Sequence, residues 1–298
     1  MTTSQHVEPP PRVSLGRRLS TFFYRHPRAG LGVLLAGPIG WLVVGYLGSL
    51  FVLLLASFWD TNPFTSEVVH NFTLDNFRRL FEQDVYREVA WRTIRMAAFV
   101  TVADALLAFP IAYYMARVAS PRVRNLLVVA VVMPLWASYL VKAYAWRTIL
   151  SDSGAINWAL GPLGITFDGY STAGLWLVFT YLWLPFMILP IYAGLERIPQ
   201  SLLDASADLG GRSLRTFLRV ILPLAFPAVV AGSIFTFSLT LGDYIAPDLI
   251  TSEQFIGTVI YDQRGTNLPV AAAFTLVPIA VMILYLLIAR RLKAFEAL

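Results

Sequence analysis

Long apolar runs without charged residues recur along the chain. Runs of about 20 residues or more, the length that crosses about 30 Å of hydrocarbon, occupy residues 29–59, 169–195, 220–242 and 265–289. Two further runs, 96–116 and 125–146, qualify if the ionisable residues Asp104 and Lys142 are accepted inside a span. The pattern therefore predicts an all-α membrane protein with six transmembrane helices.

An amphipathic segment precedes the second of these spans. Its apolar residues recur at helical spacing, while charged residues fill the other side; they are Phe77, Leu80, Phe81, Val85 and Val89. This spacing predicts one helix lying on the outer membrane face. Such a helix serves either as a ramp into the second span or as a contact for an external partner.

The composition agrees with a protein of the bilayer. Of the 298 residues, 57% are hydrophobic and only 14% are charged, which is far from the balance of a soluble domain. The first 28 residues differ, because they are rich in Pro and Arg and too polar for a cleavable signal. We therefore expect a cytoplasmic tail over residues 1–28 and a transmembrane domain over residues 29–298, with the first span retained as an anchor.

Arginines mark one side of the predicted bundle. They concentrate in the N-terminal tail, in the loop at 117–124 and at the C-terminus, whereas the loops at 60–95, 147–168 and 243–264 hold twelve Asp and Glu against seven Arg. Short basic loops stay on the cytoplasmic side, so both termini of this multi-pass plasma or inner membrane protein are expected in the cytoplasm. Basic residues dispersed beside spans suit anionic lipid headgroups and argue against nucleic-acid binding.

One charged segment, DASADLGGRSLRTFLRVILPL at residues 204–224, separates two of the spans. Ser201 and Asp204 have the spacing of a capping box, Gly210 and Gly211 suit the left-handed end of a helix, and Ser213 can cap a second helix. The segment therefore predicts two short helices joined by a hinge. Small residues at 205–207 would let another protein approach the backbone closely, the alternative being a plain amphipathic loop on the membrane.

The same segment resembles the signature of permease subunits of binding-protein-dependent ABC importers. That signature reads Glu-Ala-Ala, three residues, Gly, nine residues, Ile, one residue and Leu-Pro. The matching positions are Asp204, Ala205, Ser206, Gly210, Val220, Leu222 and Pro223. The spacing is kept in full, with Asp for Glu, Ser for Ala and Val for Ile.

Other stretches resemble one branch of these importers. The sequences at 134–146, 181–199 and 242–250 are similar to spermidine/putrescine permeases and, more loosely, to iron, thiamine, phosphonate and opine importers. The resemblance covers roughly residues 70–290. It implies that the substrate is a small solute, with a polyamine as the first expectation and the other solutes as alternatives.

The resemblance also implies a fold and a set of partners. The fold is that of a type I ABC importer permease, with a cytoplasmic coupling helix at 201–214 inside a coupling loop at 196–219. The motif residues, together with Leu214, would dock into a groove of the ATPase. The implied partners are two cytoplasmic ABC ATPase subunits, a second permease subunit, an extracytoplasmic substrate-binding protein and the lipid bilayer. No cofactor is expected on this chain, because ATP is used by the partner ATPase.

Several chemistries lack their residues in this sequence. There is no cysteine, neither of the two lysines follows a glycine as a phosphate-binding loop requires, and the three histidines lie outside the predicted spans. We therefore expect no enzyme. A secondary carrier is the alternative from a different class, although neither inverted repeats nor buried coupling groups are found. A membrane scaffold without transport activity is a third.

Six residues are candidates for the substrate pathway: Asp104, Trp136, Tyr139, Lys142, Asp243 and Tyr244. Asp104 is the only acid well inside a span, where it either faces the pathway or bonds between helices. Lys142 lies among aromatic residues near the outer end of the third span and either gates a substrate or snorkels to the interface. If the fold resembles its family, Asp243 and Tyr244 line an outer vestibule, where carboxylates and aromatic faces suit a cation.

Overall fold

The computed structural model describes residues 24–25, 27–62, 65 and 67–291, so the tail expected at 1–28 lies almost wholly outside the described residues. The chain forms two compact units, one ending at Leu55 and one beginning at Ala56. Among the described residues, five helices are long and apolar enough to cross a membrane, and one bent helix pair makes up to six. This confirms the predicted all-helical fold.

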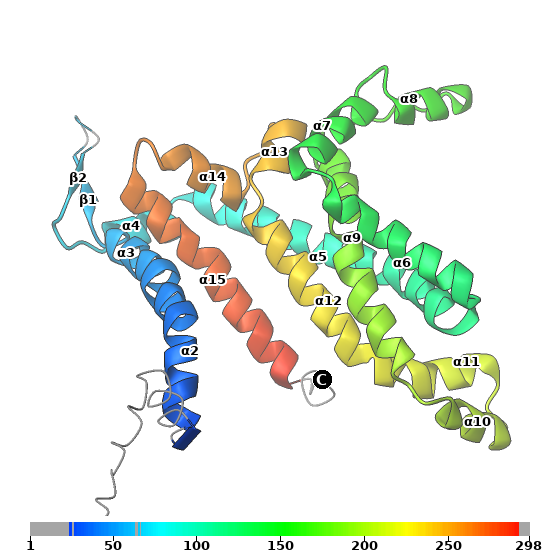
Figure 1. The fold of residues 1–298 in the computed structure, drawn as a ribbon. Coiled ribbons are helices and arrows are strands. Elements are labelled where there is room, and N and C mark those ends of the chain that lie inside the picture. The colour runs from blue at the N-terminus through cyan, green and yellow to red at the C-terminus, as the bar shows by residue number, and fades with distance from the viewer. Residues whose placement is uncertain (1–23, 26, 63–64, 66, 292–298) are drawn as a thin grey trace, which may run out of the picture. The chain divides into compact units, whose positions relative to one another are not determined.

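The first unit holds a single candidate span, drawn in blue in Figure 1. It consists of α2 (Pro27–Trp41), the π-helical turn η1 (Leu42–Leu47) and α3 (Gly48–Ala56), so the helix ends three residues before the predicted limit. Its apolar side chains are exposed along most of its length. That is the pattern of a helix surrounded by lipid or by another chain.

The second unit opens with a small hairpin and a short amphipathic helix. The hairpin pairs β1 (Asp60–Thr61) with β2 (Val68–Val69), and α4 (Asp75–Glu82) follows. The prediction of one continuous amphipathic helix is wrong, because Gln83 is extended and separates α4 from α5 (Asp84–Tyr113). The two helices bury Leu80 and Val89 against Phe274 of the last helix, while Phe81 and Val85 stay exposed.

The third predicted span is broken in two. Helix α6 (Pro121–Trp136) ends at Trp136, and α7 (Tyr139–Leu150) leaves it at an angle of 95°. Ala137 and Ser138 between them are extended, with ψ angles of 140° and 136°. Extended backbone at membrane depth is tolerated where protein or cavity water satisfies it, so periodicity alone could not show this break. The short α8 (Ala155–Leu160) and η3 (Gly161–Leu163) complete the excursion.

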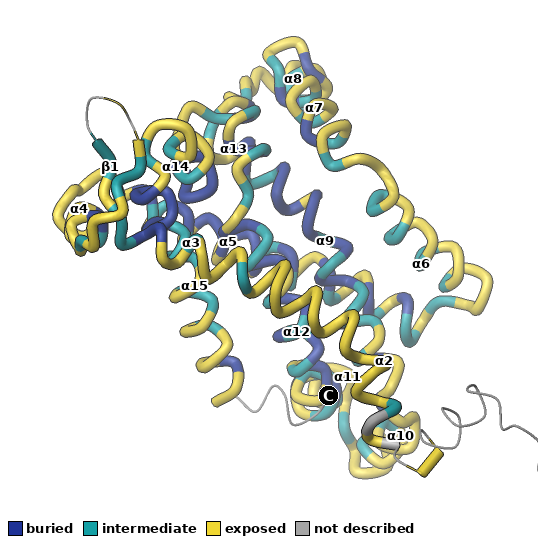
Figure 2. The backbone as a smooth tube through the Cα atoms, turned by 60° about the vertical axis from the view of Figure 1, so that its left-hand side comes forward, coloured by how far each residue is buried: buried dark blue, intermediate teal, exposed yellow. Residues whose placement is uncertain are grey.

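The remaining elements follow in chain order: α9 (Thr172–Glu196), α10 (Gln200–Asp208), α11 (Ser213–Thr216), η4 (Phe217–Ile221), α12 (Leu222–Gly242), α13 (Ile245–Ile250), α14 (Ile256–Gln263) and α15 (Leu268–Arg291). Helix α9 packs against both α5 and α12, and these three helices form the core of the unit. Figure 2 shows α9 buried along much of its length. The predicted spans at 169–195, 220–242 and 265–289 are thereby confirmed.

Glycines allow α9 and α12 to approach each other closely. A Cβ atom on Gly194 would lie 2.4 Å from the Cβ of Ala228, and one on Gly232 would lie 2.7 Å from the sulfur of Met187. Small residues at such contacts let helix backbones meet where lipid supplies no hydrophobic driving force. These two glycines therefore set the separation of α9 from α12.

Polar side chains inside this core bond mostly to nearby backbone or to one another. The hydroxyl of Thr101 donates to the carbonyl of Ala97 at 2.7 Å, and Thr236 of α12 reaches Thr101 at 3.4 Å. Ser233 lies 2.5 Å from the hydroxyl of Tyr285 on α15. Hydroxyl groups in a membrane helix satisfy themselves in this way and also tie helices together.

Replacing Gly194 by Val tests the close contact. The added side chain collides with Ala228, and overpacking of this kind costs about 1 to 3 kcal/mol. We expect Gly194→Val to lower the thermal unfolding temperature of the purified protein in detergent. The matched control is Gly40→Val, because a Cβ at Gly40 meets nothing within 4 Å. Equal unfolding temperatures for the two variants would contradict the packing argument.

Candidate functional site

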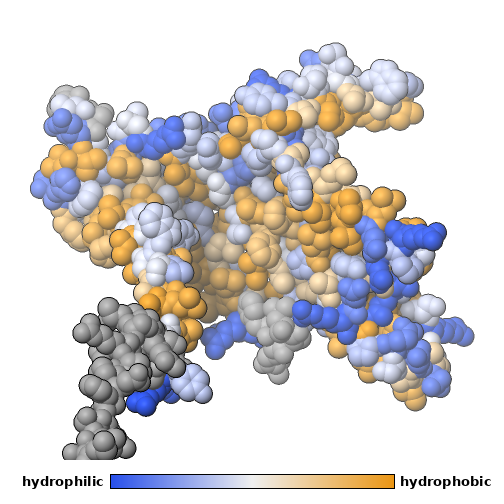
Figure 3. All heavy atoms as spheres, in the orientation of Figure 1, coloured by the Kyte–Doolittle hydropathy of each residue, from blue (hydrophilic) through white to orange (hydrophobic). Residues whose placement is uncertain are grey.

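Polar surface gathers at two ends of the second unit, with an apolar band between them. Figure 3 shows hydrophilic side chains over α10 and α11 at one end and near α8 and α13 at the other. We call the first the loop end and the second the pocket end. Candidate site residues from the sequence lie at both ends.

The segment at the loop end forms the predicted hinged pair of helices, α10 and α11. The predicted caps are wrong in detail. Pro199, without a side-chain bond, is the cap residue of α10, and Ser201 lies inside the first turn. Arg212 precedes α11, so Ser213 is its first residue rather than its cap. Ser201 lies two residues after the cap of α10 and Ser213 one residue after the cap of α11, because Pro199 and Arg212 adopt the extended backbone that starts each helix.

The hinge between the two helices depends on its two glycines for different reasons. Gly210 has a φ of +73°, the left-handed conformation predicted for the end of α10. Gly211 has no such conformation, but a Cβ there would lie 2.6 Å from the Ser206 hydroxyl and 2.9 Å from the Thr216 hydroxyl. Those two hydroxyls are 2.9 Å apart and close the helix pair by a hydrogen bond. Ser206, at an Ala position of the signature, thus turns inward.

Most motif residues of the loop face outward. Asp204, Ala205, Gly210, Leu214 and Pro223 are exposed, whereas Ser206, Val220 and Leu222 are half-buried. Leu209 and Leu214 expose 89% and 69% of their surface, which is far more than a residue packed on its own chain would. An exposed apolar ridge of this kind marks a contact surface for another molecule.

Three arginines accompany the ridge. Arg212, Arg215 and Arg219 line a hollow of 720 Å³ together with Leu214 and Leu218. Within the described part of the chain, none of these three arginines takes part in an ion pair. The loop therefore offers unpaired positive charge beside apolar side chains, which complements an acidic surface with an apolar centre.

A second hollow, of 370 Å³, lies at the pocket end. It is lined by Tyr139, Trp183, Ser238, Leu239, Gly242, Asp243, Tyr244 and Ile245. Four helices, α7, α9, α12 and α13, supply these residues together with the turn between α12 and α13. The structure thus brings three of the six candidate pathway residues, Tyr139, Asp243 and Tyr244, into one pocket.

Asp243 is the charged centre of the pocket. Its carboxylate accepts hydrogen bonds from the Tyr139 hydroxyl and from the backbone N–H groups of Ile245 at 2.9 Å and Ala246 at 3.0 Å. Burial raises the pKa of the Asp243 carboxyl above its ordinary value, while these three hydrogen bonds act in the opposite direction. The carboxylate is thereby held at the start of α13 with a fixed orientation.

Aromatic rings surround this carboxylate. Tyr139 stacks on Trp183 with ring centroids 6.0 Å apart, and Tyr244 stacks on Tyr261 at 4.5 Å. Arg264 lies 3.7 Å over the other ring of this second pair, Tyr261. A carboxylate with aromatic faces beside it binds cations, because both present negative potential.

The other three candidates lie outside this pocket. Trp136 is 88% exposed at the end of α6, and Lys142 is half-buried one helical turn after Tyr139. Asp104 is fully buried in α5 between Val100 and Ala108, and neither of its carboxylate oxygens has a hydrogen-bond partner among the described residues. Its role in the pathway stays a prediction.

Two lining residues with polar groups, Trp183 and Ser238, were not among the candidates from the sequence. Trp183 and Ser238 sit inside uninterrupted apolar runs, where one aromatic or hydroxyl residue is ordinary in a membrane helix. No helical spacing points to them: Ser238 lies five residues before Asp243, whereas residues on one helix face are three or four apart. Only the crossing of α9, α12 and α7 reveals that they meet.

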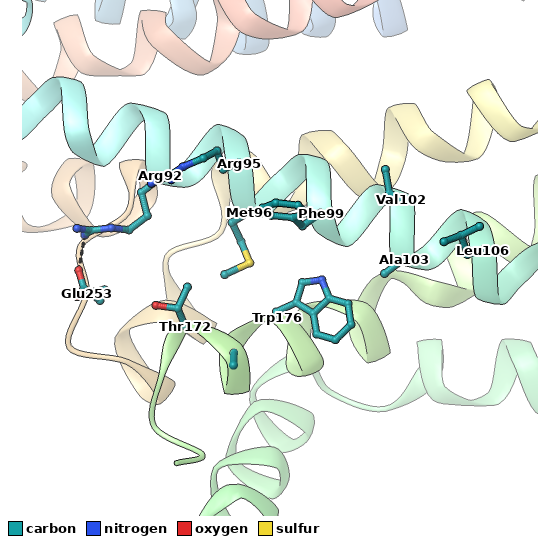
Figure 4. Close-up of a pocket in the computed structure, with 11 residues that line it drawn as sticks. Arg92, Arg95, Met96, Phe99, Val102, Ala103, Leu106, Thr172, Trp176 and Glu253 are labelled. Atoms are coloured by element: carbon teal, nitrogen blue, oxygen red, sulfur yellow. Dashed lines mark ion pairs between the residues drawn. The ribbon is translucent and has the colours of Figure 1, made fainter. Parts of the chain in front are cut away.

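A groove of 630 Å³, which is larger than the pocket around Asp243, lies between α5 and α9 (Figure 4). Its walls are mainly apolar, with Met96, Phe99 and Trp176 along the shaft. At its mouth, Arg92 is paired with Glu253 at 2.6 Å and with Glu88 at 2.9 Å. Arg92 is thus neutralised by two carboxylates, whereas Arg95, which also lines the groove, forms no ion pair among the described residues and lies 5.8 Å over the ring of Trp91.

No group of three or more metal-ligating side chains occurs within the residues that the structure describes. The pocket end thus combines the Asp243 carboxylate with aromatic side chains, and the loop end combines exposed leucines with arginines that form no ion pair among the described residues.

Comparison with known protein families matches residues 108–295 to the family described as "Binding-protein-dependent transport system inner membrane component". The inner membrane ABC transporter permease protein YdcU of Escherichia coli (strain K12) is 48% identical over 310 residues, covering 98% of this chain and 98% of YdcU. The spermidine/putrescine transport system permease protein PotB of the same organism is 32% identical over 259 residues, covering 84% of this chain and 93% of PotB.

Two solved structures share the fold. A bacterial ABC transporter involved in the import of the acidic polysaccharide alginate aligns with a TM-score of 0.67 at 18% identity, covering 92% of this chain and 99% of that chain. The alginate transporter in complex with its pentasaccharide-bound periplasmic protein aligns with a TM-score of 0.70 at 18% identity, covering 94% of this chain and 98% of that one. These alignments confirm the predicted importer permease fold.

Two substitutions of Asp243 separate its structural role from its charge. Asp243→Ala removes the acceptor for the Ile245 and Ala246 amides, and the loss of such a cap costs about 0.5 to 2 kcal/mol. Asp243→Asn keeps an acceptor oxygen for both amides. We expect the Ala variant to unfold at a lower temperature in detergent and the Asn variant to stay close to wild type. An Ala variant as stable as wild type would show that the carboxylate does not hold α13.

Proposed function

Because the chain belongs to the family of inner membrane components of binding-protein-dependent transport systems, we propose that α10 and α11 receive the ATPase of such a system and that the imported solute is a polyamine. The chain is a permease subunit of an ABC importer and a multi-pass protein of the inner membrane. It is a transport component and not a catalytic enzyme.

The observation that carries the coupling proposal is the exposed helix pair hinged at Gly210. The pair projects Leu209 and Leu214 away from the bundle and places unpaired arginines beside them. A loop that only connected α9 to α12 would not need an apolar ridge facing outward. We assign the docking surface to the exposed residues Asp204, Ala205, Gly210, Leu214 and Pro223, with the half-buried Ser206, Val220 and Leu222 supporting it from behind.

The proposed partners follow from the family and from the two ends of the molecule. Two ATPase subunits bind at the loop end, one to this chain and one to a second permease subunit. A substrate-binding protein delivers solute at the pocket end. The arginines of the loop end, including Arg117, Arg124 and Arg212, support a cytoplasmic position for it, and both termini are then cytoplasmic.

The transport cycle couples the two ends. Closure of the ATPases on ATP moves α10 and α11, and this displacement turns the pathway between the permeases from inward-facing to outward-facing. ATP is hydrolysed in the partner subunits, so this chain contributes the conformational change and part of the lining of the solute pathway. A ligand shifts such an equilibrium only by binding one state more tightly, which is what ATP does at the ATPase interface.

Two observations support a polyamine as the solute. PotB, a relative at 32% identity, is named for spermidine and putrescine transport. The pocket end presents Asp243 with Tyr139, Trp183 and Tyr244 around it, which suits an ammonium group. The same carboxylate repels a phosphonate, so among the alternative solutes the anionic ones fit this pocket poorly.

Substituting Gly210 by Pro tests the docking surface. Proline cannot adopt a φ of +73°, so the hinge must rearrange and the ridge is displaced. We expect tagged Gly210→Pro, solubilised from native membranes, to insert normally but to capture less than about a tenth of the wild-type ATPase. Gly164→Pro is the matched control, since Gly164 has a φ of +68° and equally open surroundings at the other end. Wild-type capture by Gly210→Pro would refute the assignment.

Asp243→Asn tests the solute. The substitution removes one negative charge while keeping the hydrogen-bond acceptor, so we expect spermidine uptake at sub-saturating concentration to fall about tenfold, equivalent to about 1.4 kcal/mol. Asp248→Asn removes an equal charge from the exposed face of α13 and is the control. Uptake of labelled spermidine by cells expressing each variant at equal level is the measurement. If both variants behave alike, the pocket does not select the cation.

A further inference from the structure

Arg117 lies where the loop end joins the bundle. It belongs to η2 (Tyr114–Val118), the π-helical turn that ends α5. One guanidinium nitrogen, Nη2, donates to the carbonyl of Leu195 at 2.5 Å and to the carbonyl of Ile198 at 2.6 Å. Leu195 is in the last turn of α9, and Ile198 lies between the end of α9 and Pro199, which precedes α10. The cation also faces the negative end of the α9 dipole.

The far end of the loop rests on the same helix. Phe217, the first residue of η4, meets the rings of Phe109 and Tyr113 of α5 edge-on, with centroids 5.5 and 6.3 Å apart. Phe109, Tyr113 and Arg117 are spaced four residues apart and so lie on one stripe of α5 and η2. A single helical stripe therefore holds both ends of the loop.

The two attachments differ in what movement they allow. The ring contacts of Phe217 are not directional and permit sliding, whereas two charged hydrogen bonds to fixed carbonyls do not. The neighbouring ion pair between Arg124 and Glu196 is long, at 3.4 Å, and its side chains are 33% and 49% exposed. An exposed pair of this kind contributes little. We call residues 195–199, where α9 passes into α10, the loop root. Arg117 is therefore the rigid connection between α5 and the loop root.

We infer that Arg117 is a positioning residue that transmits displacement of α10 to α5. The loop root and the end of α5 move as one body, and η2 supplies the irregular turn at which this movement enters the long helix. Helix α5 packs on both α9 and α12, so its displacement reaches the whole core. The inference rests on the proposed ATPase docking and adds the route by which docking moves the spans.

Three variants test the inference in the native complex purified through this chain. Arg117→Met keeps an unbranched side chain like the aliphatic part of Arg and removes the guanidinium with both of its hydrogen bonds. Arg117→Lys keeps the charge and hydrogen-bond donors, but on a shorter side chain without the planar guanidinium. Arg124→Gln breaks the neighbouring ion pair and is the control. Proteoliposomes are loaded with ATP, and the number of spermidine molecules taken up per ATP hydrolysed is measured. The amount of ATPase captured and the basal rate of ATP hydrolysis are measured separately for each variant.

Arg117→Met is expected to capture ATPase and to hydrolyse ATP at the basal rate, while uptake per ATP falls at least about tenfold. Arg117→Lys recovers part of that loss, and Arg124→Gln stays within about twofold of wild type. Wild-type coupling in Arg117→Met would overturn the inference. The proposed function fails separately if wild type itself captures no ATPase.

A distance measurement keeps the inference testable if Arg117→Met assembles poorly. The chain has no cysteine, so spin labels can be placed at Ser201→Cys in α10 and Leu107→Cys in α5. In the background with Arg117 intact, the distance between the labels is expected to stay constant when ATP is added, because the two segments move together. In the Arg117→Lys background, the distribution of distances between the two labels is expected to broaden when ATP is added. A distance that already changes with ATP while Arg117 is intact would also overturn the inference.

Discussion

The close contact of α9 with α12 is the constraint on which both functional ends depend. Gly194 lies against Ala228 and Gly232 against Met187, because in lipid these helices are held by packing rather than by exclusion of water. Helix α9 leads into the loop root and α12 leaves the loop, so their separation sets the loop's geometry. The same two helices supply Trp183 and Ser238 to the pocket. The two ends are therefore joined by one pair of closely packed helices.

Much of the fold could be predicted from the sequence, because a transmembrane helix is recognisable by the length and hydrophobicity of its segment. The failures share a cause, which is that backbone conformation at single residues is set by tertiary surroundings. Gln83 interrupts an otherwise periodic apolar face, and Ala137 with Ser138 breaks a run that reads as one span. Likewise, Ser201 and Ser213 are of a residue type that caps helices, but neither stands at the cap position. Pattern shows which helices exist and only approximately where they end.

The site was predictable where its residues are close in sequence and unpredictable where they are not. The loop motif spans 20 residues from Asp204 to Pro223, and its exposed hinge at Gly210 is where the spacing placed it. The bond that closes the loop, between Ser206 and Thr216, joins positions that no motif pairs. At the pocket end, Tyr139 and Asp243 are 104 residues apart and meet only through the bend between α6 and α7.

We propose that this permease moves a polyamine by means of ATP hydrolysed in partner subunits at its loop end. The most direct test places the purified complex in proteoliposomes with the binding protein outside and follows labelled spermidine. We expect spermidine to accumulate only when ATP is enclosed, whether or not an ion gradient is imposed. Accumulation driven by a proton or sodium gradient without ATP would contradict it and identify a secondary carrier.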